Sequence, residues 1–335
     1  MSIAKSSDNY KDLLLKYVET NDEEVLYQAE KLSKSAIQNN IPPEEIVNIH
    51  YQAIKEVFPN LDKKLKDSFY FLIETMISYG LAHKEYEVLR EKQIELRSEI
   101  EIAANMQNTL LRTTIPKYPS LDIGAKSVPA KIMNGDYYHF VQDNDDNIGI
   151  AIADVSGKGI PAAFCMSMIK YAMESFPTHQ MYPDAILEML NRIVIRNVDP
   201  GMFVTMFYGL YDVLNNQFYY STAGHEPGLI YRKRTDSFED IDARGLLLGV
   251  EKDVQYVQYE TQLNVGDLII LFTDGVTECR IGERFITREE IIEVIHEHIH
   301  LPAEEVVENV YKYFERMQNF NFCDDFTFII MKRTQ

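Results

Sequence analysis

Four aspartate positions in the chain lie where predicted strands give way to loops. They are Asp136 in NGDYYHF, Asp154 in IGIAIADVSGKG, Asp274 in DLIILFTDGVTE, and the Asp324-Asp325 pair in CDDFTFIIMKR. Carboxylates gathered at one end of a sheet repel one another, and hard cations such as Mg²⁺ or Mn²⁺ relieve that repulsion by binding their oxygens. The pattern therefore predicts a divalent-metal site.

The chemistry expected of such a site is phosphoester hydrolysis. Two divalent ions held about 4 Å apart by shared carboxylates lower the pKa of a bridging water and neutralise the oxygens of a phosphoryl group. No G-x-S-x-G elbow or catalytic-cysteine setting stands out, so a covalent nucleophile is not expected. Each aspartate alone is also explained as a turn or helix N-cap residue, but four together favour hydrolysis by metal-activated water.

Composition limits the classes of partner. The chain has 335 residues, 46% of them hydrophobic and 25% charged, which is typical of a soluble globular protein with room for two domains. With 33 basic against 52 acidic residues and a net charge of -19, it offers no basic face for nucleic acid or for an anionic membrane. We therefore expect neither partner.

Cysteine usage and the terminus indicate the compartment. Cys165, Cys279 and Cys323 are widely spaced and lack a C-x-x-C pair, which argues against a disulfide framework or a zinc knuckle. The polar N-terminus has no apolar signal core, and no uncharged stretch is long enough to span a bilayer. A cytoplasmic protein is expected.

The first quarter of the chain has the periodicity of helices. Apolar residues from Asp12 to about Gly80 recur at helical spacing, in about four segments. Pro42-Pro43 followed by Glu44-Glu45 marks a helix start, because proline suits the first turn and acidic residues favour the positive end of the helix dipole. Residues 1–81 are predicted to be an all-α regulatory, partner-binding and dimerisation domain.

Residues 82–112 are predicted to form a long linker helix. They contain neither Pro nor Gly, and a 3-4 repeat runs through Ala82, Tyr86, Leu89, Gln93, Leu96, Ile100, Ala103, Gln107 and Leu110. Seven of these nine are apolar, which favours a coiled-coil seam in a homodimer, weakened by its two glutamines. The alternative is a helix packed on its own domain.

Beyond Ile115-Pro116 the pattern changes to β-branched and aromatic runs separated by turns. Strands are expected at 121–130, 137–141, 148–154, 202–213, 217–224, 228–233, 254–260, 267–274 and 326–331, and helices at 162–176, 183–198, 288–300 and 303–317. Antiparallel hairpins with helices in pairs predict an α+β layered domain over 113–335.

An ordered set of motifs in this region resembles the metal-dependent serine/threonine phosphatases of the PPM (protein phosphatase 2C) family, in its SpoIIE-type bacterial branch. The motifs are GD at 135–136, ADVSGKG at 153–159, AGHEP at 223–227, TDGVTE at 273–278 and DDFT at 324–327. IPPEEIVNIH and FLIETMISYG also resemble the helical domain of RsbU-like members. The resemblance implies an αββα sandwich of two antiparallel sheets flanked by helix pairs.

The resemblance also implies a site with two Mn²⁺ or Mg²⁺ ions. By this resemblance Asp154 bridges the two metals, the Val155 carbonyl helps to hold one of them, and Asp136 supports the cluster. The other ion belongs to Asp274 together with one member of the Asp324-Asp325 pair, and the family pattern favours Asp324. The catalytic set is accordingly Asp136, Asp154, Asp274 and Asp324.

The group that orients the phosphate is left open by the sequence. The family's phosphate-gripping arginine has no match near the start of this domain, so Lys158 and the amides of Gly157 to Gly159 are candidates, with ordinary loop geometry as the alternative. His225 in AGHEP either approaches the site or is a hydrogen-bonded loop residue.

The implied substrate is a phosphorylated anti-anti-sigma factor, whose dephosphorylation activates a general stress-response sigma factor. The implied activator is a switch-kinase-like protein that binds the N-terminal domain. We expect its binding to order the seam, so that the linker helix pushes the Asp154 loop and the helix starting at Pro161 into a metal-competent position, with Gln93 and Gln107 keeping the seam weak.

Two alternatives compete with the phosphatase. His296-Glu297-xx-His300 matches H-E-x-x-H, the pattern of zinc metallopeptidases. Against this reading, Leu301-Pro302 follows at once, and Ile291, Ile295 and Ile299 define a core face that leaves both histidines on its flank. A catalytically inactive regulatory scaffold would require degenerate carboxylates, and none is replaced here.

Overall fold

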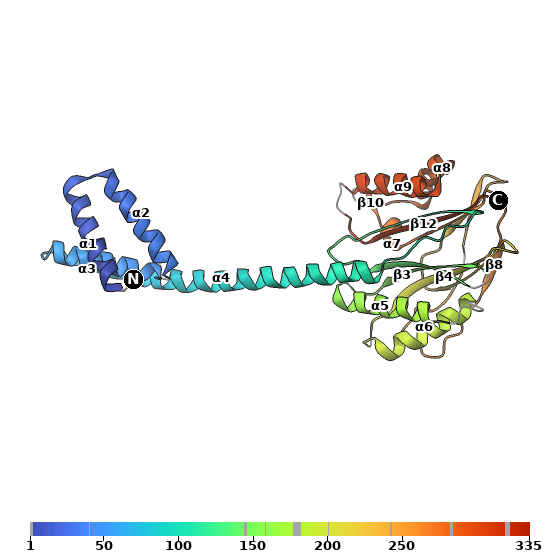
Figure 1. Ribbon diagram of the computed structural model, residues 1–335, viewed down its shortest axis with the longest axis horizontal. Helices are drawn as coiled ribbons and strands as arrows, with labels where there is room; N and C mark the ends of the chain where they lie inside the picture. Colours follow the sequence, from blue (N-terminus) through green and yellow to red (C-terminus); the bar gives the residue numbers. More distant parts are fainter. Residues whose placement is uncertain are drawn as a thin grey trace. The chain divides into compact units, whose positions relative to one another are not determined.

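The computed structural model describes residues 3–39, 41–143, 146–157, 159–176, 182–199, 201–241, 243–281, 284–318 and 322–335. The chain divides into two compact units, Met1–Ser98 and Glu99–Gln335. Figure 1 labels the helices and several of the strands.

The N-terminal unit is helical, as predicted. It holds α1 (Ile3–Thr20), α2 (Glu23–Gln38), α3 (Pro43–Val57) and the first part of α4 (Lys63–Leu110). Asp22 caps α2 by accepting a 3.0 Å hydrogen bond from the Glu24 amide. The Tyr10 hydroxyl lies 2.9 Å from His50 Nδ1 and joins α1 to α3.

Helix α4 is one continuous helix of 48 residues, where the sequence suggested two. Gly80 does not end it. A Cβ on Gly80 would lie 2.7 Å from Glu44 Oε2, so this glycine allows α3 to pack closely on α4. Among the described residues, no helix combines the length and the apolar character needed to cross a membrane.

Two five-stranded antiparallel sheets form the centre of the second unit. The first sheet has the order β1 (Leu121–Val128), β12 (Phe326–Arg333), β9 (Leu268–Phe272), β6 (Leu229–Arg232) and β7 (Ser237–Asp240). The second has the order β2 (Asp136–Gln142), β3 (Ile148–Val155), β4 (Val204–Asp212), β5 (Gln217–Ala223) and β8 (Tyr259–Gln262).

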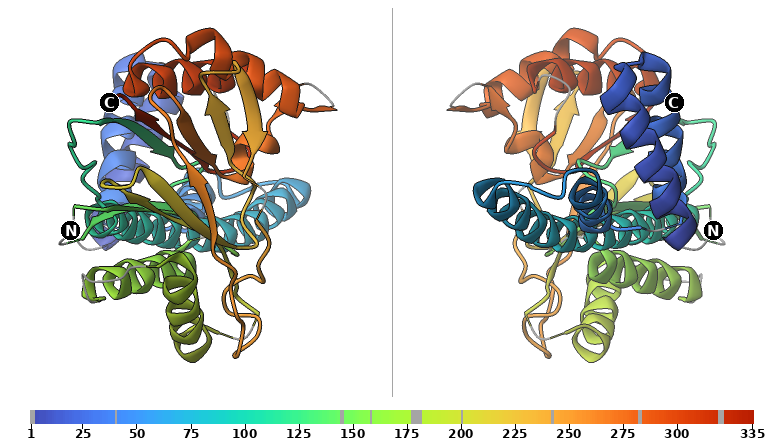
Figure 2. Two further views of the ribbon diagram at one scale, coloured as in Figure 1. Left: turned by 90° about the vertical axis from the view of Figure 1, so that its right-hand side faces the viewer. Right: turned by 90° about the vertical axis from the view of Figure 1, so that its left-hand side faces the viewer.

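Helix pairs cover the outer faces of the two sheets (Figures 1 and 2). Helices α5 (Ile160–Ser175) and α6 (Pro183–Asn197) pack on the second sheet, with Met166 and Leu190 in their core. Helices α8 (Arg288–His298) and α9 (Ala303–Met317) pack on the first sheet, and Phe207 and Phe218 fill the layer between the sheets. The predicted αββα sandwich is confirmed.

Several boundaries differ from the predicted ones. The strand expected over 254–260 is reduced to β8, and β7 was not anticipated because it is short and polar. Three further short elements were also missed, namely α7 (Asp274–Thr277), β10 (Arg280–Ile281) and β11 (Arg284–Phe285). Helix α8 ends at His298, two residues before the predicted end, because Pro302 follows closely.

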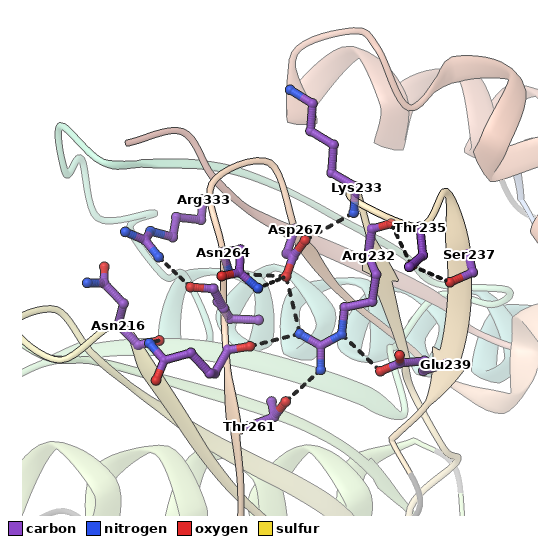
Figure 3. A network of polar contacts seen from close by, with 12 residues as sticks. Asn216, Arg232, Lys233, Thr235, Ser237, Glu239, Thr261, Asn264, Asp267 and Arg333 are labelled. Atoms are coloured by element: carbon purple, nitrogen blue, oxygen red, sulfur yellow. Dashed lines mark hydrogen bonds and ion pairs between the residues drawn. The ribbon is translucent and has the colours of Figure 1, made fainter.

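Arg232 clamps the two sheets together at the edge drawn in Figure 3. From β6 it donates to the Gln262 carbonyl at 2.8 Å and to Thr261 Oγ1 at 2.7 Å, both on β8 of the other sheet. It also lies 3.2 Å from the buried carboxylate of Asp267 and 2.9 Å from Glu239. This clamp holds the sandwich closed at an edge that has no carboxylate motif.

Candidate active site

Asp136 and Asp154 lie directly opposite each other on β2 and β3. Strand β3 is an almost wholly buried apolar run, which fixes the position of Asp154 near its end. Gly157 and Gly159 then adopt φ values of 94° and 83°, which let the chain turn into α5. Lys158, between them, lies outside the described residues.

The carboxyl group of Asp136 is buried, with 2% of the residue exposed. Burial raises its pKa well above the ordinary value, and the charges of Asp154 and Asp325 add to that rise. Thr273 Oγ1 opposes the rise by donating a 2.6 Å hydrogen bond to Asp136 Oδ2. Because Thr273 follows β9 of the first sheet, this bond joins the two sheets at the site.

Asp274 and Asp324 belong to the first sheet, where β9 and β12 are neighbours. Asp274 begins α7 just after β9, and Asp324 precedes β12. Burial, followed by the charges of Asp324, Glu278 and Glu226, raises the pKa of Asp274 to about 6. These carboxylates are therefore close enough to repel one another strongly.

Asp325 differs from Asp324 in its contacts. It is buried, and its Oδ1 accepts a 2.7 Å hydrogen bond from the Ala130 amide, while its Oδ2 accepts a short one from the Gly135 amide. Both of its oxygens thus hold the loop that leads to Asp136. The Asp324 carboxylate faces the charge of Asp274 instead.

Gly135 lies between carboxylates of the two sheets. A Cβ at Gly135 would lie 2.9 Å from Asp325 Oδ2 and 3.5 Å from Asp154 Oδ1. Val155, whose carbonyl was an expected ligand, donates its amide to the Gly135 carbonyl at 3.2 Å. A larger residue here would have to displace the Asp325 carboxylate.

The donor set is suited to hard cations. Within the ranges that the structure describes, no three His, Cys, Asp or Glu side chains are already closed into a metal-binding group. The aspartates nevertheless gather at one end of the sandwich, where burial, with a further contribution from neighbouring carboxylates, raises the pKa values of Asp136 and Asp274. Carboxylate oxygens are the ligands that Mg²⁺ and Mn²⁺ prefer.

The AGHEP loop contributes residues that sequence reasoning did not place. His225 is buried, and its Nδ1 lies 3.0 Å from Thr205 Oγ1, the residue opposite Asp154 on β4. Burial lowers the His225 pKa to about 4, so the ring is neutral. The neighbouring Glu226 interacts with Asp274. AGHEP belongs to the same ordered set of motifs as the aspartates, and this was the signal in the sequence that could have placed these residues at the site.

A hydrogen-bonded network behind Asp136 was also missed. Gln107, 2% exposed, donates to the Asn134 carbonyl at 2.7 Å and accepts from the Asn134 amide at 3.1 Å. The Asn134 side chain accepts from the Asp136 amide and donates to Ser127 Oγ, which in turn accepts from Thr327. Gln107 was expected to weaken an open seam, and the structure corrects this: it is an interior residue of the second unit.

The two histidines of the H-E-x-x-H pattern are not brought together as a zinc site. Helix α8 ends at His298, so His300 lies beyond it. His296 Nε2 instead lies 2.9 Å from Asp236 Oδ1, which also accepts a 2.7 Å bond from the Tyr231 hydroxyl. The pattern is explained by this local surface network.

Comparison with known proteins agrees with the geometry. The family model for stage II sporulation protein E (SpoIIE) matches residues 144–334, and that for the N-terminal domain of phosphoserine phosphatase RsbU matches residues 8–82. Phosphoserine phosphatase RsbU of Bacillus subtilis is 51% identical over 324 residues, covering 97% of this chain and 96% of that protein.

Solved structures share the fold. The SiaA-PP2C domain of Pseudomonas aeruginosa superposes with a TM-score of 0.61 at 19% identity, covering 73% of this chain and 98% of that one. The RsbU and RsbW domains of a Mycobacterium tuberculosis protein give a TM-score of 0.58 at 25% identity, covering 67% and 62%. The chain therefore belongs to the RsbU family of phosphoserine phosphatases and has a PP2C-type catalytic domain.

Proposed function

We propose that this phosphatase uses two Mn²⁺ or Mg²⁺ ions to hydrolyse a phosphoserine or phosphothreonine on an anti-anti-sigma factor. The observation that carries the proposal is the convergence of Asp136 and Asp154 from one sheet with Asp274 and Asp324 from the other. Release of the dephosphorylated protein would then activate a stress-response sigma factor. A cytoplasmic location is part of the proposal, and the free thiols of the chain accord with it.

The proposed division of roles follows the contacts of each carboxylate. Asp154 lies opposite Asp136, and its Oδ1 and Asp325 Oδ2 both lie beside Gly135, so Asp154 would be shared by the ions, with the Val155 carbonyl as an additional oxygen. Asp274 and Asp324 would serve one ion between them. When bound, the ions would supply an activated water and neutralise the phosphoryl oxygens.

Asp325 is assigned a positioning role in this proposal. Both of its oxygens already accept backbone hydrogen bonds from the loop before Asp136, so we do not assign Asp325 as a metal ligand. Asp136 is itself oriented by Thr273 and by the Asn134 side chain. These bonds hold a charged group in a fixed place, which is how electrostatic catalysis avoids reorganisation during the reaction.

Activation is proposed to pass along α4. In a single chain, the seam positions Tyr86, Leu89 and Leu96 are about two thirds exposed, so a second copy has apolar surface to cover. At the other end of the same helix, Gln107 holds the loop that precedes Asp136. A kinase-like activator on the N-terminal domain would favour the homodimer and thereby fix α4 against this loop.

The direct test is dephosphorylation of a phosphorylated anti-anti-sigma protein from the same organism. Full-length protein is incubated with it and Mn²⁺, with and without the kinase-like activator, and phosphate release is measured. Metal-dependent release that the activator accelerates is expected, and Asp154→Asn is the matched inactive control. Peptide cleavage dependent on Zn²⁺, or release unaffected by chelation of divalent ions, would contradict the proposal.

A further inference from the structure

Two of the three cysteines flank the half of the site that belongs to the first sheet. Cys279 follows the segment that begins at Asp274, and Cys323 immediately precedes Asp324. Both are free thiols, Cys279 buried at 1% exposure and Cys323 exposed. The third cysteine, Cys165, belongs to α5 and is buried in the cluster between α5, α6 and the second sheet.

The two backbone segments that carry these cysteines are in contact. A Cβ on Gly275 would lie 1.9 Å from the Asp325 carbonyl oxygen, so the start of α7 touches the chain just before β12. Cys279 lies four residues after Gly275, just beyond the end of α7, and Cys323 lies two residues before Asp325. Both cysteines are therefore only a few residues from the point where the two segments touch.

Side-chain contacts agree with this placement. The Gln318 side chain hydrogen bonds with the Cys279 thiol, and its Oε1 accepts a 3.0 Å bond from the Cys323 amide. Phe322, next to Cys323, packs against the same hydrophobic cluster that contains Cys279. One amide group therefore touches both cysteine residues.

We propose that Cys279 and Cys323 are an oxidation site, in which hydrogen peroxide converts the two thiols into an intrachain disulfide. The exposed Cys323 sulfur attacks the peroxide, giving a sulfenic acid and releasing water. Cys279 then forms the S–S bond, and its proton leaves with the hydroxyl group as a second water. Two electrons pass from the two sulfurs to the peroxide, and a dithiol reductant reverses the change.

The roles of the two thiols follow from their surroundings. Cys323 is open to solvent, where a small oxidant can reach it. Cys279 is enclosed, and burial raises the pKa of its thiol, which makes it a poor first target. Its closeness to Cys323 suits it to the second step, because intramolecular reaction needs no accessible surface.

Oxidation is expected to weaken metal binding at the adjacent carboxylates, an effect that rests on the proposed function. Cys323 must turn from solvent toward Cys279, which moves Asp324 relative to Asp274 and displaces Gln318. Metal ligands tolerate distance changes of only about 0.2 Å. The Mn²⁺ concentration for half-maximal activity should rise about tenfold or more, in line with other changes next to metal ligands.

The test treats the full-length protein with hydrogen peroxide, alkylates free thiols, digests with trypsin and maps the peptides by mass spectrometry. The expected product joins peptide 253–280 to peptide 317–332, lacks two hydrogen atoms, and disappears after dithiothreitol. Cys323→Ser should abolish it and keep the reduced protein's activity. Cys165→Ser, the matched control, should retain it.

Two results would overturn the inference. One is recovery of Cys323 as a sulfinic acid while Cys279 is still alkylated, and the other is a link between Cys323 residues of two chains. Peptide mapping does not depend on turnover, so a failed disulfide is distinguishable from a failed phosphatase assignment. A mapped disulfide with unchanged Mn²⁺ dependence would contradict only the proposed effect on the metals.

Discussion

Gln107 and Asn134 form a reciprocal pair of hydrogen bonds, in which the glutamine side chain satisfies both backbone groups of the asparagine. Gly135 and Asp136 follow Asn134 in the chain, and the Asn134 side chain accepts a hydrogen bond from the Asp136 amide. A single residue, Asn134, therefore connects helix α4 to Asp136, which is proposed to support the metal site. This contact gives the activation proposal a physical route.

Gln107→Leu should strongly reduce activator-stimulated activity. It leaves the buried Asn134 amide and carbonyl unpaired, at a cost of about 1–3 kcal/mol, and frees the loop before Asp136. Because small displacements of catalytic groups reduce rates strongly, activator-stimulated phosphate release should fall on the order of tenfold or more.

The matched control is Gln93→Leu, at an exposed seam position of the same helix. It should tighten the dimer in analytical ultracentrifugation and raise activity without the activator. A Gln107→Leu variant as active as wild type would contradict the proposed route from α4 to the loop before Asp136. So would a Gln93→Leu variant that dimerises more tightly yet gains no activity.

Substitution separates the two members of the aspartate pair. Asp324→Asn removes a charge that faces Asp274, so the Mn²⁺ concentration for half-maximal activity should rise by about tenfold or more with little change in thermal stability. Asp325→Asn places an amide NH₂ against a backbone N–H, which should destabilise the domain by about 1–3 kcal/mol. Thermal unfolding and Mn²⁺ titration, measured on both variants, distinguish the roles. The reverse pattern would make Asp325 the ligand.

His139 should make stability fall in mild acid. Burial lowers its folded-state pKa to about 4 from an ordinary value of 6.5, with Glu174 opposing the shift and Lys170 adding to it. The unfolded chain therefore binds the proton first as pH falls, and stability that is complete above about pH 7 is lost between pH 6.5 and 4. From pH 7 to pH 5 the loss should be about 2 kcal/mol.

The contribution of His139 is isolated with His139→Gln, which can keep a contact to the Thr113 hydroxyl. Urea unfolding is followed by near-ultraviolet circular dichroism at both pH values. The variant should lose less stability than wild type over this interval. Equal losses in the two proteins would show that His139 is not the titrating group.

The Arg232 clamp should be structural alone. Arg232→Met keeps much of the side-chain volume but leaves the buried Asp267 without its cation, at a cost of about 3 kcal/mol. Two backbone amides still donate to Asp267, so the domain should fold. The melting temperature should fall while kcat and the Mn²⁺ dependence at 20 °C stay within about twofold. A selective loss of kcat would connect this edge to the site.

The sequence predicted the parts of the site that follow from strand patterns. Asp154 and Asp274 end long apolar runs, and such runs position their last residues reliably. The hydroxyl and amide network was not predictable, because Thr273 beside Asp274 and Asn134 beside Gly135 look like turn residues. Gln107 was assigned to the seam because helical periodicity does not reveal whether a helix face is covered by a second copy of the helix or by the chain's own domain. The break expected near Gly80 failed because close packing against Glu44 stabilises the helix there.

Anomalous diffraction from crystals soaked in Mn²⁺ tests the central claim most directly. The account predicts two peaks at the end of the sandwich where the aspartates gather, with Asp154 oxygens near both and with Asp274 and Asp324 near one. Crystals of Asp154→Asn should show reduced occupancy, and turnover of that variant should fall by about 10²-fold. Wild-type crystals with the aspartates in place and no manganese peak among them would contradict the account.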